Sequence, residues 1–140
     1  MTIQVSEMKR DYMNILIVDD DVTDARLLQE LFSEVEPPAP YVVHEEKLAT
    51  ACQRLQEERF DIVLLDFFLP GSQGIESLSV LREQAPEVPI IFLTGLQDDE
   101  LSRKMMEFGA QGYVVKGQLG GKELLHTLRE VIARYQAKHS

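Results

Sequence analysis

Four short apolar runs in this chain of 140 residues each end directly in polar residues. The runs are 15–18, 62–65, 90–93 and 113–115, and they are followed by the acidic triplet 19–21, Asp66, Thr94 and Lys116. In an open parallel sheet the carboxyl ends of the strands lie along one edge, so these polar residues would share one crevice. The pattern therefore favours a sheet at whose edge carboxylates, a hydroxyl and an ammonium meet.

The rest of the chain alternates strand patterns with helical patterns. Strands are predicted at 14–19, 41–44, 61–66, 90–94 and 113–115, and each is followed by apolar residues at helical spacing. The strands are almost continuously apolar, which suits burial on both faces. We predict an α/β fold, a doubly wound (βα)5 sandwich with a parallel five-stranded sheet, whose strand order periodicity does not reveal. Residues 1–12 are expected to form a tail before one domain at 13–140.

The composition indicates the cellular environment of the chain and the kinds of partner it can bind. The net charge of -10 should repel a phosphate backbone, so direct nucleic-acid binding is not expected. The single Cys52 cannot form a disulfide within the chain, which fits a reducing cytoplasm. We predict neither a signal peptide nor a membrane span. The histidines lie outside the strand-end set and are expected to have ordinary surface roles; they are His44, His126 and His139.

The polar strand ends have the chemistry for a divalent cation and a phosphoryl group. Three consecutive acids repel one another unless a cation or base offsets their charge, and Mg²⁺ accepts a few hard oxygen ligands. One acid of the triplet, Asp21, or else Thr23, could instead cap the following helix. A carboxylate such as Asp66 can attack a phosphoryl donor to give an acyl phosphate, with Thr94 and Lys116 able to bind its oxygens.

These motifs resemble the receiver domain of bacterial two-component response regulators. The segments ILIVDDD, LLDFFLP, IIFLTG and GYVVKG match that family's motifs in order, and the resemblance extends over residues 14–138. It implies a flavodoxin-like fold and a phosphorylation-dependent signalling switch. Such a domain is a regulatory phosphoacceptor that catalyses only its own phosphorylation and dephosphorylation.

The resemblance also implies roles for the residues at the strand ends. Asp66 would be the phosphorylated aspartate. Asp20 would bind Mg²⁺ directly, Asp19 through water, and Phe68 through its backbone carbonyl, with Asp66 completing the metal site.

The remaining motif residues would respond to the phosphoryl group. Thr94 and Lys116 would hold its oxygens, and Tyr113 would be an aromatic switch that moves inward as Thr94 is drawn to the phosphate. The implied partners are a sensor histidine kinase or phosphotransfer protein and a downstream protein or fused output domain. Segments 72–74 and 116–118 resemble a subgroup at the front of larger sensory proteins, and the last helical stripe could pair with a second copy of the chain.

Two positions depart from the family pattern. Gly117 stands where the family usually has a proline, often after a cis peptide, so we predict a trans or locally rearranged link from Lys116. Phe68 is bulky where side chains influence water access to the phosphoryl group, and this suggests slow autodephosphorylation.

Two other functions remain open from the sequence. Asp19 and Asp21 also fit the opening motif of haloacid dehalogenase-type phosphatases, as nucleophile and acid/base, with Thr94 and Lys116 in the expected order. That interpretation lacks an acidic strand end after Lys116 and leaves Asp66 without a role. The third possibility is a receiver-like binding module that works without phosphorylation.

Overall fold

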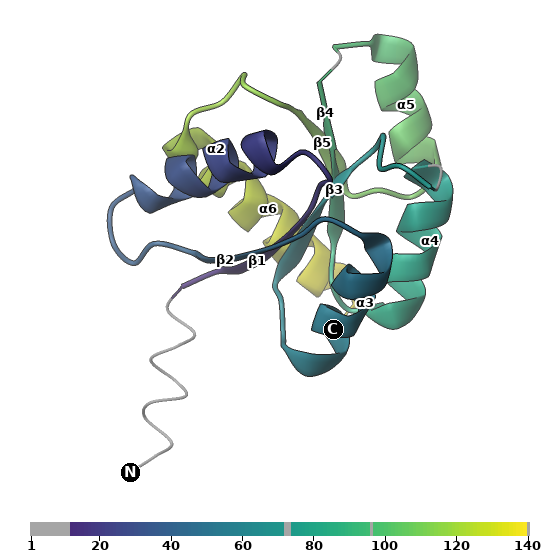
Figure 1. Ribbon diagram of the computed structural model, residues 1–140, viewed down its shortest axis with the longest axis horizontal. Coiled ribbons are helices and arrows are strands. Elements are labelled where there is room, and N and C mark those ends of the chain that lie inside the picture. Colours follow the sequence, from purple (N-terminus) through teal and green to yellow (C-terminus); the bar gives the residue numbers. More distant parts are fainter. Residues whose placement is uncertain (1–11, 72–73, 96, 140) are drawn as a thin grey trace.

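The computed structural model describes residues 12–71, 74–95 and 97–139, so most of the predicted tail and two residues of segment 72–74 lie outside it. Strands and helices alternate along the chain (Figure 1). The strands are β1 (Asn14–Val18), β2 (Tyr41–Glu45), β3 (Ile62–Asp66), β4 (Ile90–Thr94) and β5 (Gly112–Val115). The helices are α2 (Val22–Ser33), α3 (Leu48–Glu57), α4 (Gly74–Gln84), α5 (Asp99–Glu107) and α6 (Gly121–His139).

The five strands form one parallel sheet in the order β2-β1-β3-β4-β5. The predicted fold class is confirmed, and the strand order, which periodicity did not give, is that of the flavodoxin-like doubly wound fold. The chain moves from β1 to β2 on one side and then returns past β1 to β3 on the other. The reversal places a topological switch point between the carboxyl ends of β1 and β3, where ligands bind in such sheets.

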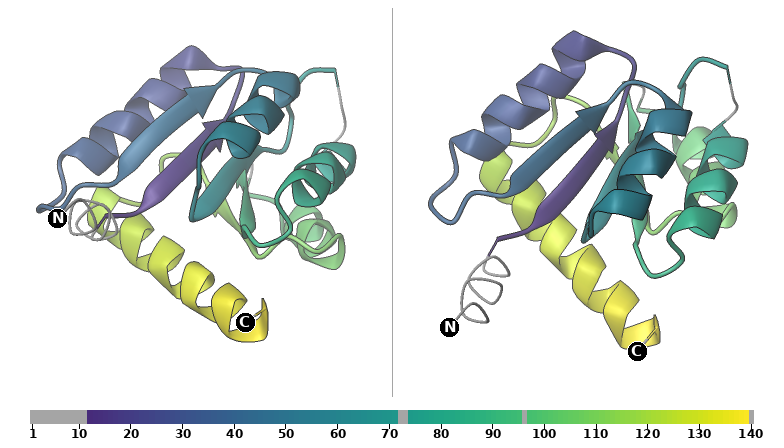
Figure 2. Two further views of the ribbon diagram at one scale, coloured as in Figure 1. Left: turned by 90° about the horizontal axis from the view of Figure 1, so that it is seen from below. Right: turned by 60° about the horizontal axis from the view of Figure 1, so that its bottom comes forward.

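Each face of the sheet is covered by its own set of helices, as the two views in Figure 2 show. Helices α3, α4 and α5 cover one face, where Leu16, Val63 and Phe92 are buried. Helices α2 and α6 cover the other, where Ile17 and Leu64 are buried. Successive strand residues alternate between these faces, so strands with apolar residues at nearly every position have no solvent-facing side.

The helical stripes are mostly but not wholly buried. Ala25, Leu28 and Phe32 of α2 are buried, whereas Leu27 of the same helix is exposed. The reason is geometric, because residue 27 lies about 100° around the helix from residue 28 and the covered stripe is narrower than the apolar one. Phe108, the C-cap residue of α5, is likewise exposed.

Within the described part of the chain, no helix combines the length and the apolar character needed to cross a membrane.

Candidate functional site

The predicted site residues gather at the carboxyl edge of the sheet. Asp19 directly follows β1, Asp66 is the last residue of β3, and Thr94 is the last residue of β4. Lys116 follows β5, and its backbone N–H donates to the carbonyl of Thr94 at 2.8 Å. Parallel pairing of β1 with β3 and of β4 with β5 brings these ends together at the switch point.

Three carboxylates form a cluster suited to a cation. Asp19, Asp20 and Asp66 each offer an oxygen, and these oxygens lie within 4.8 Å of one another. Asp19 is fully buried and Asp66 almost so, whereas Asp20 faces solvent. Hard oxygen donors in small number, with one side open to water, match the preference of Mg²⁺.

The environment of Asp66 makes its ionised form costly. Burial raises the pKa of this carboxyl to about 6, and the neighbouring carboxylate of Asp19 adds to the increase. A hydrogen bond from the Phe68 backbone N–H to Asp66 Oδ1, 3.0 Å long, and the Lys116 ammonium both oppose it. The Asp66 carboxylate is therefore held in place by a backbone donor while its charge remains only partly compensated.

Lys116 supplies the positive charge at this edge. Its Nζ lies 2.8 Å from Asp19 Oδ2, at an angle unfavourable for a hydrogen bond, and 3.6 Å from Asp66 Oδ2. It also donates a hydrogen bond of 2.8 Å to Asp24 Oδ2. Burial alone would lower the pKa of the ammonium, but the three carboxylates outweigh that effect and hold its pKa above the usual value. Lys116 is thus charged at neutral pH.

The acidic loop is fixed by its own hydrogen bonds. Asp19 Oδ1 accepts from the backbone N–H of Asp21 at 2.9 Å. Asp21 is the N-cap of α2, and its Oδ1 accepts from the N–H groups of Thr23 and Asp24. The predicted cap is confirmed for Asp21, and capping leaves Asp20 as the exposed member of the cluster.

Thr94 and Tyr113 differ sharply in exposure. Thr94 is 1% exposed at the end of β4, and Tyr113 is 41% exposed on the outer strand β5. Phe68, two residues after Asp66, is 53% exposed and makes an edge contact with Phe67 at a centroid distance of 5.1 Å. The bulky side chain two residues after Asp66 is therefore largely accessible to solvent.

The link between Lys116 and Gly117 is a trans peptide, since the cis bond among the described residues is at Pro37–Pro38. Gly117 has a φ of +84°, a conformation that glycine adopts without penalty. A proline, with φ fixed near -65°, could not occupy this backbone. The glycine in place of the family's usual proline therefore allows a backbone conformation that proline cannot adopt.

Two contacts at the site were not predicted. His44 of β2 was expected to lie apart from the strand ends, and that expectation is wrong: its Nε2 is 2.6 Å from the carbonyl oxygen of Asp19. Pairing of β2 with β1 causes this, because His44 lies opposite Ile17. Asp24 was overlooked although it follows the cap by three residues, a spacing that places both on one turn of the helix.

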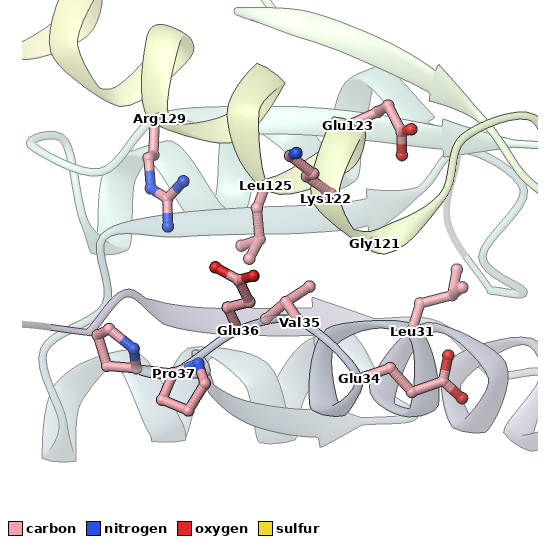
Figure 3. Close-up of a pocket in the computed structure, with 11 residues that line it drawn as sticks. Leu31, Glu34, Val35, Glu36, Pro37, Gly121, Lys122, Glu123, Leu125 and Arg129 are labelled. Carbon is pink, nitrogen blue, oxygen red and sulfur yellow. The ribbon is translucent and has the colours of Figure 1, made fainter.

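A separate hollow lies between the end of α2 and the start of α6 (Figure 3). Its lining includes Leu31, Val35 and Leu125 and none of the residues predicted for the site. A Cβ at Gly121 would collide with the backbone carbonyl of Leu31, so glycine permits this close approach of the two helices. This hollow has no part in the chemistry at the sheet edge.

Comparison with known proteins decides the family. The family model of the response regulator receiver domain matches residues 15–129, a span that includes all four polar strand ends. The chain belongs to the response regulator receiver domain family. Receiver domains are phosphorylation-dependent signalling switches, and the matches support that regulatory function for this chain. The phosphatase interpretation receives no support from them.

Individual relatives agree with the family match. The transcriptional activator protein IrlR of Burkholderia pseudomallei is 34% identical over 128 residues, which cover 91% of this chain and 54% of that protein. The response regulator GacA of Pseudomonas aeruginosa is 28% identical, over 86% of this chain and 56% of that protein. The chain thus spans about half the length of these curated relatives.

Solved structures show the same fold. A CheY-like response regulator receiver domain protein from Methanospirillum hungatei has a TM-score of 0.74 at 23% identity, covering 91% of this chain and 98% of that one. The signal receiver domain of an HD domain-containing protein from Pseudomonas fluorescens has a TM-score of 0.75 at 27% identity, covering 91% and 92%.

Proposed function

We propose that Asp66 is the phosphoacceptor of this receiver domain. The observation that supports this best is the position of Asp66 at the end of a fully buried strand, in one cluster with Asp19 and Asp20 and 3.6 Å from the Lys116 ammonium. An oxygen of Asp66 attacks the phosphorus of a phosphohistidine, a new O–P bond forms, and the N–P bond breaks. The imidazole keeps the electron pair and takes a proton.

Asp19, Asp20 and Asp66, together with the backbone carbonyl of Phe68, would hold Mg²⁺. The residues fit this ion, because three carboxylates converge within 4.8 Å and a single ammonium does not neutralise them. When bound, Mg²⁺ supplies charge neutralisation for the transferring phosphoryl group. The Phe68 N–H bond to Asp66 Oδ1 keeps the carboxylate oriented for attack.

Phosphorylation adds about -1.5 to -2 charges at Asp66, by analogy with other phosphorylated side chains. The Lys116 ammonium and the Thr94 hydroxyl bind the new oxygens. Movement of Thr94 toward the phosphoryl group opens space beside β4, and the exposed ring of Tyr113 turns inward to fill it. The surface of β4, β5 and the adjoining helices then changes, which is how a partner senses the phosphate.

The phosphoryl donor in this proposal is a sensor histidine kinase or a phosphotransfer protein. The recipient of the signal is a downstream protein or an output domain joined to residues 13–140, since the matched relatives are about twice as long. A second copy of the chain, paired through α6, is the other partner in this proposal. We place the protein in the cytoplasm and assign it neither a membrane nor a nucleic-acid contact of its own. Its only catalysis is its own phosphorylation and dephosphorylation.

A phosphodonor experiment tests the proposed function. The intact protein, incubated with Mg²⁺ and acetyl phosphate, should gain the mass of one phosphoryl group, and chelation of Mg²⁺ should prevent the gain. Asp66→Ala should abolish it. Steady turnover of small phosphoesters with no dependence on Asp66 would instead support the phosphatase, in which Asp19 is the nucleophile. A folded protein that takes up no phosphoryl group would support the binding module.

A further inference from the structure

Asp24 contacts the phosphorylation site without belonging to its metal cluster. The oxygens that converge are those of Asp19, Asp20 and Asp66, and Asp24 is on the first turn of α2. Its side chain is 35% exposed, yet its Oδ2 accepts a hydrogen bond of 2.8 Å from Lys116 Nζ. A residue of the helix thus binds the ammonium that, among the described residues, forms an ion pair with Asp66.

The position of the Lys116 ammonium favours Asp24 over Asp66. Nζ is at hydrogen-bond distance from Asp24 Oδ2, whereas its distance of 3.6 Å from Asp66 Oδ2 is longer than a charge-assisted hydrogen bond. Asp19 Oδ2 is at 2.8 Å and is fixed by its place in the buried loop. Of the three carboxylates around Nζ, Asp24 is the most exposed, and it is the one that phosphorylation chemistry does not otherwise use.

Once a phosphoryl group is present, its oxygens compete with Asp24 for the Lys116 ammonium. Lys116 has three N–H donors, and each one directed at Asp24 is not directed at the acceptor or its phosphoryl oxygens. A partly exposed ion pair of this kind changes an equilibrium by roughly up to fivefold. That strength is enough to bias the lysine and too small to prevent its transfer.

We propose that Asp24 is a positioning residue that holds Lys116 away from Asp66 and so restrains phosphorylation. This inference rests on the proposed function, because it assigns Lys116 to the phosphoryl group. In the resting protein the ammonium is bound to Asp24 and Asp19. During phosphorylation the hydrogen bond to Asp24 is exchanged for one to a phosphoryl oxygen, with no proton transferred.

The test compares Asp24→Asn with a matched neighbour, Asp21→Asn. Both variants remove one negative charge from the start of α2, and asparagine at position 21 still caps the helix. Asp21 caps α2 through its own side chain and has no contact with Lys116 among those described. With acetyl phosphate and Mg²⁺, we expect Asp24→Asn to be phosphorylated roughly two- to fivefold faster than the natural protein. Asp21→Asn should match the natural rate, and Asp24→Glu should restore it.

An equal acceleration in both asparagine variants would show a general charge effect and overturn the proposal. So would an unchanged or slower rate for Asp24→Asn. A crystal structure of metal-free Asp24→Asn provides a readout independent of phosphorylation, in which Nζ should approach Asp66 Oδ2 to about 2.9 Å. If Lys116 Nζ does not move toward Asp66 in this variant, the proposed restraint by Asp24 is contradicted. If the natural protein takes up no phosphoryl group, the proposed function fails, and this structure still decides whether Asp24 positions Lys116.

Discussion

Lys116 Nζ lies 3.6 Å from Asp66 Oδ2, although Lys116 follows β5, Asp66 ends β3, and β4 lies between these two strands. The lysine side chain reaches across the end of β4 toward β1 and β3, where Asp19 also contacts it. The electrostatic environment of Asp66 therefore depends on residues at the ends of three strands, β1, β3 and β5. Most of the site's chemical behaviour follows from how incompletely this one ammonium compensates the carboxylates around it.

Removal of the Asp66 charge should stabilise the fold at neutral pH. The folded pKa of about 6 exceeds the ordinary value of 3.8, so the folded state holds this proton more tightly than the unfolded state. The contribution to stability is complete below about pH 4 and is lost as the pH rises through 6. Asn cannot ionise, and Asp66→Asn should gain about 1–3 kcal/mol over the natural protein at pH 7.5 without Mg²⁺.

Urea unfolding at pH 4 and pH 7.5 measures this difference. The two proteins should have similar free energies of unfolding at pH 4 and should separate at pH 7.5. If Asp66→Asn were the less stable protein at pH 7.5, the carboxylate would be a structural element of the fold and not a costly functional group.

Mg²⁺ should stabilise the protein through the acidic cluster. At ten times its dissociation constant, an ion that binds only the folded state adds about 1.4 kcal/mol to the free energy of unfolding. Asp20→Asn removes one of the three clustered carboxylates and should weaken this response. Asp21→Asn keeps the helix cap and should respond like the natural protein. Equal losses in both variants would indicate a diffuse charge effect in place of a defined site.

Phe68 should prolong the life of the phosphorylated state. Its backbone N–H donates to Asp66 Oδ1 and its ring is about half exposed, so a bulky residue adjoins the carboxylate that a hydrolytic water must approach. Phe68→Asn should therefore lose the phosphoryl group faster, because the smaller polar side chain admits and orients water. The decay of phosphorylated protein, followed by mass after removal of the donor, checks this, and a decay no faster than that of the natural protein would refute the role of Phe68.

Substitution of Gly117 should lower the stability of the fold because of the backbone conformation at this residue and not because of steric crowding. No atom lies within 4 Å of a Cβ built at this residue, but its φ is +84°. Gly117→Ala should cost about 1–2 kcal/mol of stability. Gly117→Pro should cost more, because the ring fixes φ near -65° and the loop after Lys116 must rearrange. Thermal unfolding measures both, and a proline variant as stable as the natural protein would show that the positive φ is not required.

The sequence predicted the features that depend on local pattern. The buried strands, the cap at Asp21 and the meeting of Asp19, Asp66, Thr94 and Lys116 at one edge follow from apolar runs and from the geometry of parallel sheets. The strand order did not follow, since it depends on which strands pair across long separations. The contact between His44 and Asp19 was missed for that reason, because it exists only when β2 pairs with β1.

Asp24 was missed for a different reason. In sequence it is one acid among several at the start of a helix, where favourable interaction with the helix dipole explains it fully. The contact between Asp24 and Lys116 is visible only in the structure. The fold brings several carboxylates together, and the flexible lysine side chain can bind any of them. Motif spacing identifies which residues meet, whereas the partner of a shared ammonium depends on distances of a few tenths of an ångström.

The most direct test of the account is to trap the acyl phosphate chemically and locate it. After incubation with Mg²⁺ and acetyl phosphate, borohydride reduces an aspartyl phosphate to homoserine, and peptide mass spectrometry identifies the altered residue. We expect homoserine at position 66 and aspartate unchanged at positions 19, 20, 21 and 24. Homoserine at position 19, or none at any aspartate of a protein shown to be folded, would contradict Asp66 as the phosphoacceptor.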